Sequence, residues 1–185
     1  SQGSPGVRMR ASVRSVYGDI SPLASVFADR NQAELLGVAN GSSPLKVIVP
    51  ELEVRTVEQN TPFAGVVNTI TVSIKANCDL PAGSTVTIHE LTGSATPNGT
   101  LGIVRGNGGF GDSGVWDAYG NLTLTSVGMV RTQTYEARFN VTNPATSQGS
   151  PGVRMRASVR SVYGDISPLA SVFADRNQAE LLGVA

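Results

Sequence analysis

The strongest constraint on the fold of this chain is an exact internal repeat. Residues 1–39 occur again, without a change, as residues 147–185, so the sequence repeats after 147 − 1 = 146 positions and residues 40–146 occur once. Duplicated domains diverge, whereas an unchanged copy indicates a uniform tandem array with a period of 146 residues. Because the chain has no initiator Met, no tag and no foreign linker at the seam, we expect it to be a window from such an array.

A 146-residue unit is long enough to bury the core of one domain. Lys plus Arg and Asp plus Glu are 14 each, so no net field attracts nucleic acid, and no nucleic-acid partner is expected. No run approaches the roughly 18 apolar residues of a membrane span, and no membrane insertion is expected. The single cysteine, Cys78, excludes a disulfide within a repeat and continues an apolar series that predicts a core position.

Apolar and polar residues alternate with period two along most of the unit, which predicts strands with one buried face. Residues 70–78 are the clearest case, with Ile70, Val72, Ile74, Ala76 and Cys78 on one side. The same pattern covers residues 85–89, 121–125, 135–142 and 153–159, and a less regular one covers 45–59, where Pro50 indicates an edge strand that breaks and switches sheets. Helical periodicity is absent except in the stretch RNQAELLGV.

Seven or eight strands with turn formers between them predict an all-β fold, a two-sheet antiparallel β-sandwich of immunoglobulin-like topology with one domain per repeat. Gly and Ser cluster at residues 40–44, which predicts a linker there. Residues 43–185 would then form one complete repeat, and residues 1–39 would be the C-terminal strands of the preceding one. We further expect residues 147–160 to pair with residues 135–141 in one sheet, so that Glu136 lies beside Arg154 and Arg156.

Four phrases carry a resemblance to a known repeat: NTITVSIKANCDLPAGSTVTI, LTGSATPNGTLGI, GNLTLT and TYEARFNVTNPATSQGSPGVRMRAS. They resemble a repeat found many times over in very large predicted surface or secreted proteins of microalgae and other protists. The likeness covers about residues 43 to 160 and departs from that pattern at Cys78 and in the charge-rich segment from Glu51 to Glu58. The resemblance implies an immunoglobulin-like module in tandem, with no assigned enzymatic activity.

The main candidate modification is N-glycosylation. Four asparagines stand in Asn-X-Ser/Thr sequons, namely Asn40, Asn98, Asn121 and Asn140. The strand pattern places Asn121 and Asn140 on outward faces and the other two in a linker and a turn, so all four are expected to be exposed and N-linked glycans are expected partners. The alternative is a set of ordinary turn and surface asparagines.

No catalytic, cofactor-binding or metal-binding residues are predicted. His89 is the single histidine, the glycine-rich stretch RGNGGFGDSG lacks the Lys of a phosphate-binding loop, and Asp112 and Asp117 match no calcium motif. We interpret the glycine-rich stretch as a long loop between strands. Phe110, Trp116 and Tyr119 are a possible ligand loop, although a lone Trp in a sandwich more often plugs the core.

The expected function is structural: a non-catalytic repeat of a long extracellular or cell-surface glycoprotein fibre. The alternative is an adhesin-type module that recognises a glycan or protein through its loops. In the structural hypothesis neighbouring identical repeats contact head to tail, and each tail completes the sandwich before it. Apolar residues near the end of each copy are the expected inter-repeat junction, namely Leu35, Leu36 and Val38 and their copies Leu181, Leu182 and Val184.

Overall fold

A computed structural model describes residues 6–9, 13–15, 18–20, 26–160, 172–173 and 175–176. The chain divides into two units, residues 1–49 and 50–185. Every regular element of the described residues is a β-strand, and none of the described segments is a helix able to cross a membrane.

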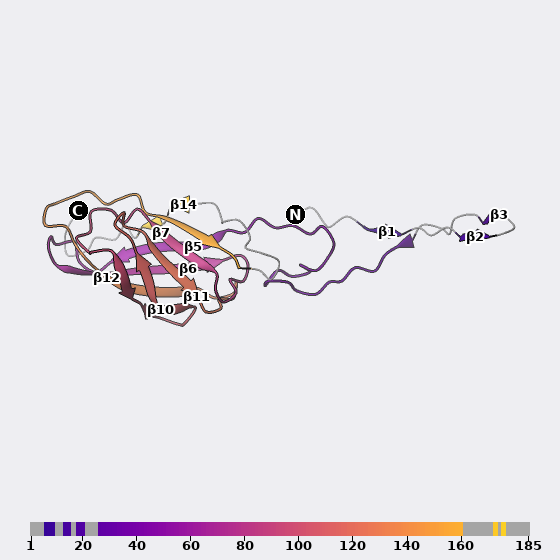
Figure 1. Cartoon of the computed structure of the whole chain (residues 1–185), viewed down its shortest axis with the longest axis horizontal. Coiled ribbons are helices and arrows are strands. Elements are labelled where there is room, and N and C mark those ends of the chain that lie inside the picture. Colours follow the sequence, from indigo (N-terminus) through magenta and orange to yellow (C-terminus); the bar gives the residue numbers. More distant parts are fainter. Residues whose placement is uncertain are drawn as a thin grey trace. The chain divides into compact units, whose positions relative to one another are not determined.

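The unit of residues 50–185 contains two sheets of described strands (Figure 1). The order in the first is β14 (Val172–Phe173), β13 (Arg154–Ser158), β7 (Thr85–His89), β11 (Leu122–Ser126), β10 (Phe110–Trp116) and β8 (Gly99–Gly102). The order in the second is β15 (Asp175–Arg176), β5 (Leu52–Gln59), β6 (Val67–Ala76), β12 (Tyr135–Thr142) and β9 (Val104–Arg105). Neighbouring strands are antiparallel except β15 and β5, which are parallel. The unit is an all-β, sandwich-like fold, as the alternation predicted.

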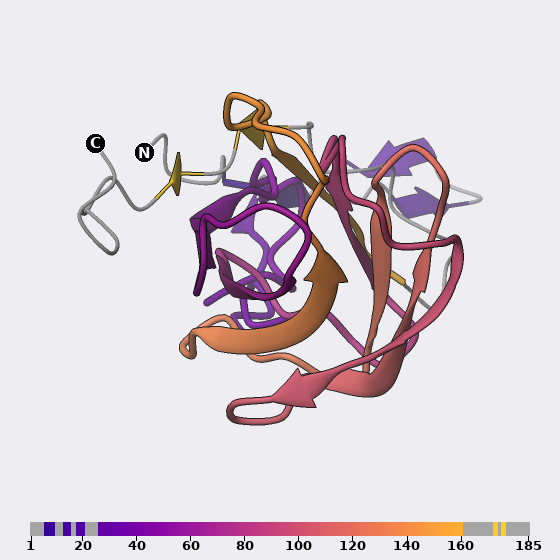
Figure 2. The same ribbon diagram turned by 90° about the vertical axis from the view of Figure 1, so that its left-hand side faces the viewer.

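The core lies between the two sheets, and Figure 2 shows strands of both around the interior. The predicted inward series is buried, with Val72 and Ile74 of β6 fully covered and Cys78, two residues after the strand, 5% exposed. Burial, aided by the negative charge of Asp79, raises the pKa of the Cys78 thiol. The period-two pattern also gave the correct buried faces of β7, β11, β12 and β13, whose members include Val86, Ile88, Leu122, Leu124, Ala137, Phe139, Met155 and Ala157.

The predicted pairing of residues 147–160 with residues 135–141 is wrong. β13 lies in the other sheet and pairs with β7, while β12 lies between β6 and β9. As a result Glu136 forms an ion pair with Arg138 of its own strand, at 2.6 Å, and Arg154 pairs with Glu90, at 3.5 Å. Burial of Val153 and Met155 was predicted correctly because it depends on the alternation alone and holds in either sheet.

The glycine-rich stretch at residues 105–114 is not the long loop predicted. β9 ends at Arg105 and β10 begins at Phe110, so a short turn crosses from one sheet to the other. Gly109 has φ +92°, and a Cβ on it would lie 2.3 Å from the ring of Tyr135. Glycine is required there by both the backbone conformation and the space.

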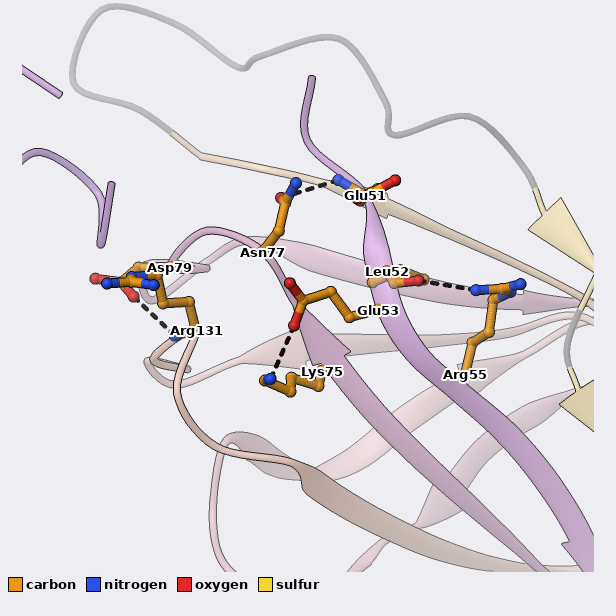
Figure 3. Close-up of polar contacts among 8 residues, drawn as sticks. All are labelled: Glu51, Leu52, Glu53, Arg55, Lys75, Asn77, Asp79 and Arg131. Carbon is orange, nitrogen blue, oxygen red and sulfur yellow. Dashed lines mark hydrogen bonds and ion pairs between the residues drawn. The ribbon is translucent and has the colours of Figure 1, made fainter. Parts of the chain in front are cut away.

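β5 enters its sheet just after Pro50, so the proline precedes the strand and does not break it. A bulge between Leu52 and Val54 shifts the register on β6, and Glu53 reaches Lys75 in an ion pair of 2.8 Å. Figure 3 shows this end of the sheet, where the Glu51 amide donates to Asn77 Oδ1, Arg55 donates to the Leu52 carbonyl, and the Arg131 amide donates to Asp79 Oδ1. Two of these contacts, Glu53 with Lys75 and Glu51 with Asn77, join the charge-rich segment to β6 and to the residue that follows it.

The unit of residues 1–49 contains two nested strand pairs among its described residues. β1 (Arg8–Met9) pairs with β4 (Val26–Phe27), and between them in sequence β2 (Val13–Ser15) pairs with β3 (Gly18–Ile20). The stretch RNQAELLGV is not helical: Leu35 and Val38 bridge across a tight turn in which Leu36 and Gly37 both have positive φ. Such a turn closes a hairpin with a two-residue loop. Of the two loop residues, Gly37 is the one that is typical of such turns.

Candidate functional site

The two copies of the repeated sequence form the same hairpin. We name β13 with β14 the C-terminal tail hairpin, and β1 with β4 the N-terminal tail hairpin. In the first, Arg154 is opposite Phe173 and Met155 is opposite Val172; in the second, Arg8 is opposite Phe27 and Met9 is opposite Val26. These positions differ by the repeat period of 146, so the register is identical in both hairpins. The local sequence therefore specifies the hairpin, whether or not a sandwich is attached.

The C-terminal tail hairpin is built into the six-stranded sheet. β13 pairs with β7 over five residues, from Arg154 opposite His89 to Ser158 opposite Thr85. Its inward side chains are covered: Met155 is 0% exposed and Ala157 1%. The Arg160 amide donates to Ser84 Oγ at 3.0 Å, which extends the attachment beyond the strand. The edge of β7 is therefore the place where the tail joins the sandwich.

The tail reaches the second sheet as well. β15 pairs with β5, with Asp175 opposite Thr56 and Arg176 opposite Val57. One continuous tail thus covers β7 in one sheet and β5 in the other. The tail therefore covers the edges that β7 and β5 would otherwise leave unpaired, and unpaired strand edges are sites of aggregation.

The N-terminal tail hairpin leaves the equivalent of Met155 uncovered. Met9, the equivalent of the fully buried Met155, is 61% exposed, and Phe27 is 64% exposed. Phe27 contacts residues of its own hairpin, since the Arg8 guanidinium carbon lies 4.5 Å from its ring centroid. Within the described residues β1 has β4 as its strand partner and no counterpart of β7.

The predicted junction residues are described in one copy. Leu35 is 52% exposed, and Leu36 and Val38 are half-buried within the unit of residues 1–49. Their copies Leu181, Leu182 and Val184 lie outside the described residues, so their burial at an inter-repeat junction stays a prediction.

The possible ligand loop does not come together as three exposed aromatic side chains. Phe110 is 0% exposed and Trp116 is 2% exposed, and the Trp116 indole donates to the Thr96 carbonyl at 3.3 Å. Both are core residues because they point inward from β10, which agrees with the core-plug alternative for Trp116. Tyr119 is 78% exposed and remains available to a ligand.

Tyr119 lies at a groove of about 670 Å³ at one end of the six-stranded sheet. Charged and polar residues of three strands and two loops line it, including His89, Glu90, Asp117, Tyr119, Arg154 and Arg156. The Glu90–Arg154 ion pair forms part of this lining. A groove with an exposed aromatic ring and several polar groups suits a sugar better than an apolar molecule.

Asp117 holds the turn that carries Tyr119. Its carboxylate accepts from the Asn121 amide at 2.9 Å, the Asn121 side chain at 2.8 Å and the Tyr119 amide at 2.8 Å. These bonds, the Asn121 amide first, lower the pKa of Asp117 from its ordinary value of 3.8. Gly120 completes the turn at φ +77°, where a Cβ would lie 2.5 Å from the Leu91 carbonyl oxygen.

We expect the Asp117 carboxyl to titrate below pH 3.8 in an NMR titration of the folded chain. Because its folded pKa is depressed, the stability it contributes is present above the unfolded value and is lost as pH falls through the folded pKa. Asp117→Asn should remove this part of the acid dependence. A midpoint at or above 3.8 would show that the three bonds do not hold the charged form.

The sequon asparagines differ in their surroundings. Asn40, Asn98 and Asn140 are exposed, as predicted, whereas Asn121 is half-buried. The Asn121 side chain donates to Asp117 Oδ2 and accepts from the Glu90 amide at 3.1 Å, so both ends of its amide are engaged. The prediction that all four asparagines are exposed is therefore wrong for Asn121, because its side chain closes the turn between β10 and β11.

In a secretory expression host, we expect glycan occupancy to be higher at Asn98 and Asn140 than at Asn121. The turn that engages Asn121 is local in sequence and can form before distant contacts do. Site-by-site mass spectrometry of glycopeptides measures the occupancies, with Asn121→Gln as a control that removes one sequon. Full occupancy at Asn121 beside unmodified Asn98 would contradict the expectation.

Within the described ranges, no group of three or more His, Cys, Asp or Glu side chains comes together. No protein-family model matches the chain, and no curated protein sequence matches it significantly.

Proposed function

We propose that this chain is a structural repeat of a long extracellular or cell-surface glycoprotein fibre, with an immunoglobulin-like sandwich in each 146-residue period. In this proposal each sandwich is completed by the tail that follows it. Residues 147–185 complete the sandwich of this chain, and residues 1–39 complete the one before it. N-linked glycans cover the exposed faces.

The observation that carries the proposal is the identical register of the two tail hairpins. One hairpin is seated on β7 with Met155 fully buried, and the other leaves Met9 61% exposed. An exposed Met9, at the position that is buried in the seated hairpin, is what a tail without its sandwich would show. Burying the Met9 side chain would contribute roughly 1.5 to 3 kcal/mol before entropy is subtracted.

The strand order supports the immunoglobulin-like assignment. Successive strands change sheet at β6 to β7, at β8 to β9 and β9 to β10, at β11 to β12 and β12 to β13, and at β14 to β15. Repeated crossing between two antiparallel sheets is typical of Greek-key sandwiches. The tail's contacts with both sheets support the proposal of a junction shared between repeats, which would limit bending more than a flexible linker does.

Electron microscopy of a chain lengthened by several 146-residue periods tests this proposal. We expect straight rods with regularly spaced sandwiches. The matched control carries a flexible Gly/Ser segment in place of residues 40–44 and of the equivalent residues in each added period. If the two chains have the same distribution of bend angles, the repeats are beads on a string and the stiff-fibre proposal fails.

A second candidate function, an adhesin-type module, is favoured by the groove beside Tyr119. The ring is 78% exposed and stands at a polar lining that includes Arg156 and His89. Stacking of a sugar on this ring would explain the arrangement.

A glycan array separates the second function from the first. We expect a binding signal that Tyr119→Ala lowers roughly tenfold, since an aromatic contact of this kind is worth about 1 kcal/mol or more. Tyr17→Ala, in the repeated sequence, is the control. Absence of any binding on the array, or equal binding by both variants, would remove the adhesin candidate.

A further inference from the structure

The chain carries two identical tail sequences and one copy of β7. We infer that the N-terminal tail hairpin is a strand donor whose partner is a second copy of this chain, so that separate chains join end to end through β7. This inference rests on the proposed function, because it requires that the tail complete the sandwich. It adds that the completing tail need not belong to the same polypeptide.

The first argument for strand donation is the shared register of the two tail hairpins. In the seated hairpin, Arg154 is opposite His89 and Met155 is opposite Ile88. Arg8 and Met9 occupy the equivalent places in the N-terminal tail hairpin, whose internal pairing is the same. The donor is therefore already folded in the conformation that β7 binds, which lowers the ordering entropy lost on binding.

The second argument for strand donation is the exposure of the N-terminal tail hairpin. β1 pairs with β4 on one side, and the described residues give it no strand on the other, which is the side that β13 offers to β7. Met9 is 61% exposed where Met155 is 0% exposed. A second copy of this chain provides the ladder partner and the apolar cover together, which is the mode of strand addition to a sheet.

The hairpin of a second chain must compete for β7 with the chain's own C-terminal tail hairpin. The C-terminal tail hairpin is joined to its sandwich by a short connection, so its effective concentration at β7 is high. Intact chains should exchange tails slowly. A chain whose own tail is weakened should accept the hairpin of another chain.

The test is a disulfide between separate chains, made in a Cys78→Ala background to remove the native thiol. The donor carries Arg8→Cys. The acceptor carries His89→Cys and Met155→Asp, which weakens its own tail. Residues directly opposite across an antiparallel pair have Cβ atoms about 4.5–5.5 Å apart, near the reach of a disulfide. We expect a cross-linked dimer on a non-reducing gel, with its yield lowered roughly tenfold or more by Met9→Asp in the donor.

A second acceptor variant keeps the test valid if Met155→Asp prevents folding. Arg156→Pro weakens β13 by removing a ladder donor, without placing a charge in the core. Trp116 fluorescence shows whether each acceptor is folded. If a folded acceptor gives no more dimer than it gives with the Met9→Asp donor, the inference is overturned.

A chain with Arg8→Cys, His89→Cys and Met155→Asp together distinguishes the partner. A ladder of linked oligomers supports exchange between chains. A cross-linked monomer overturns the inference, because the hairpin would then fold back onto its own sandwich.

The failure of this inference can be told from failure of the proposed function. A chain with Arg154→Cys and His89→Cys should form an internal disulfide, since the tail completes its own sandwich. If that bond forms and the bond between chains does not, exchange alone is overturned. If the internal bond does not form, the proposed function falls with it.

Discussion

Met155→Asp should lower the free energy of unfolding by about 3–5 kcal/mol, while the same substitution at Met9 should change it by less than about 0.5 kcal/mol. The two residues have identical sequence neighbours on both sides. Met155 is 0% exposed on β13, so a carboxylate there would be buried without a partner, whereas Met9 is 61% exposed. Denaturant unfolding followed by the fluorescence of Trp116, the single tryptophan, measures both variants.

The comparison is internally controlled, because propensity and the unfolded chain are nearly the same for the two variants. Equal losses at both positions would mean that the N-terminal tail hairpin is packed as closely as the C-terminal one. Negligible losses at both would mean that β13 does not complete the sandwich. Either result would contradict the assignment of β7 as the binding edge of the tail.

Asn68→Asp should cost about 3–5 kcal/mol at neutral pH. Asn68 is 1% exposed, and its Nδ2 donates to Gln59 Oε1 at 2.9 Å and to Asn143 Oδ1 at 2.8 Å. Its Oδ1 faces the amides of Asn60 and Thr61 at 3.3 and 3.4 Å. Aspartate would place an acceptor and a charge against two acceptor oxygens in the core.

Asn140→Asp is the matched control for this substitution. Asn140 lies on β12, beside β6, and is exposed, with Oδ1 accepting from Thr69 Oγ1 at 2.8 Å. Its replacement should change the free energy of unfolding by less than about 0.5 kcal/mol. Thermal and denaturant unfolding of the unglycosylated chain compare the two variants. Similar losses would show that burial of the amide network does not determine the cost.

The buried faces of the sandwich could be predicted because alternation on β6, β7, β11, β12 and β13 reads directly as burial. Sheet membership could not, since β13 buries Met155 equally well beside β7 or beside β12. The partner strand of β13 is set by the connection at residues 143–153, which crosses from one sheet to the other. No local sequence pattern predicts that crossing.

The strands β8 and β10 were missed for a different reason. Inward positions of β10 include Gly114, whose missing side chain is replaced in space by the ends of Leu122 and Leu124. A bulge between Phe110 and Gly114 also interrupts the alternation. Because neighbouring leucines fill the space beside a glycine of β10, the sequence of this strand is typical of a loop.

The exact repeat predicted a tail shared between repeats, which stays a prediction. The structure shows the same register in the two tail hairpins. The aromatic loop failed because Phe110 and Trp116 point inward, and the burial of Asn121 followed from its bond to Asp117, which residue type alone did not signal.

The parallel pairing of β15 with β5 bears on how the unit would respond to tension. β5 is the first strand of residues 50–185, and β15 is the last strand described in it. A pull applied before β5 and after β15 would slide the two strands past each other along their length, because parallel neighbours attached at opposite ends are loaded in shear. Their hydrogen bonds would carry the load together and could not open one after another, so this short pair would act as a mechanical clamp at the point where force enters the sandwich.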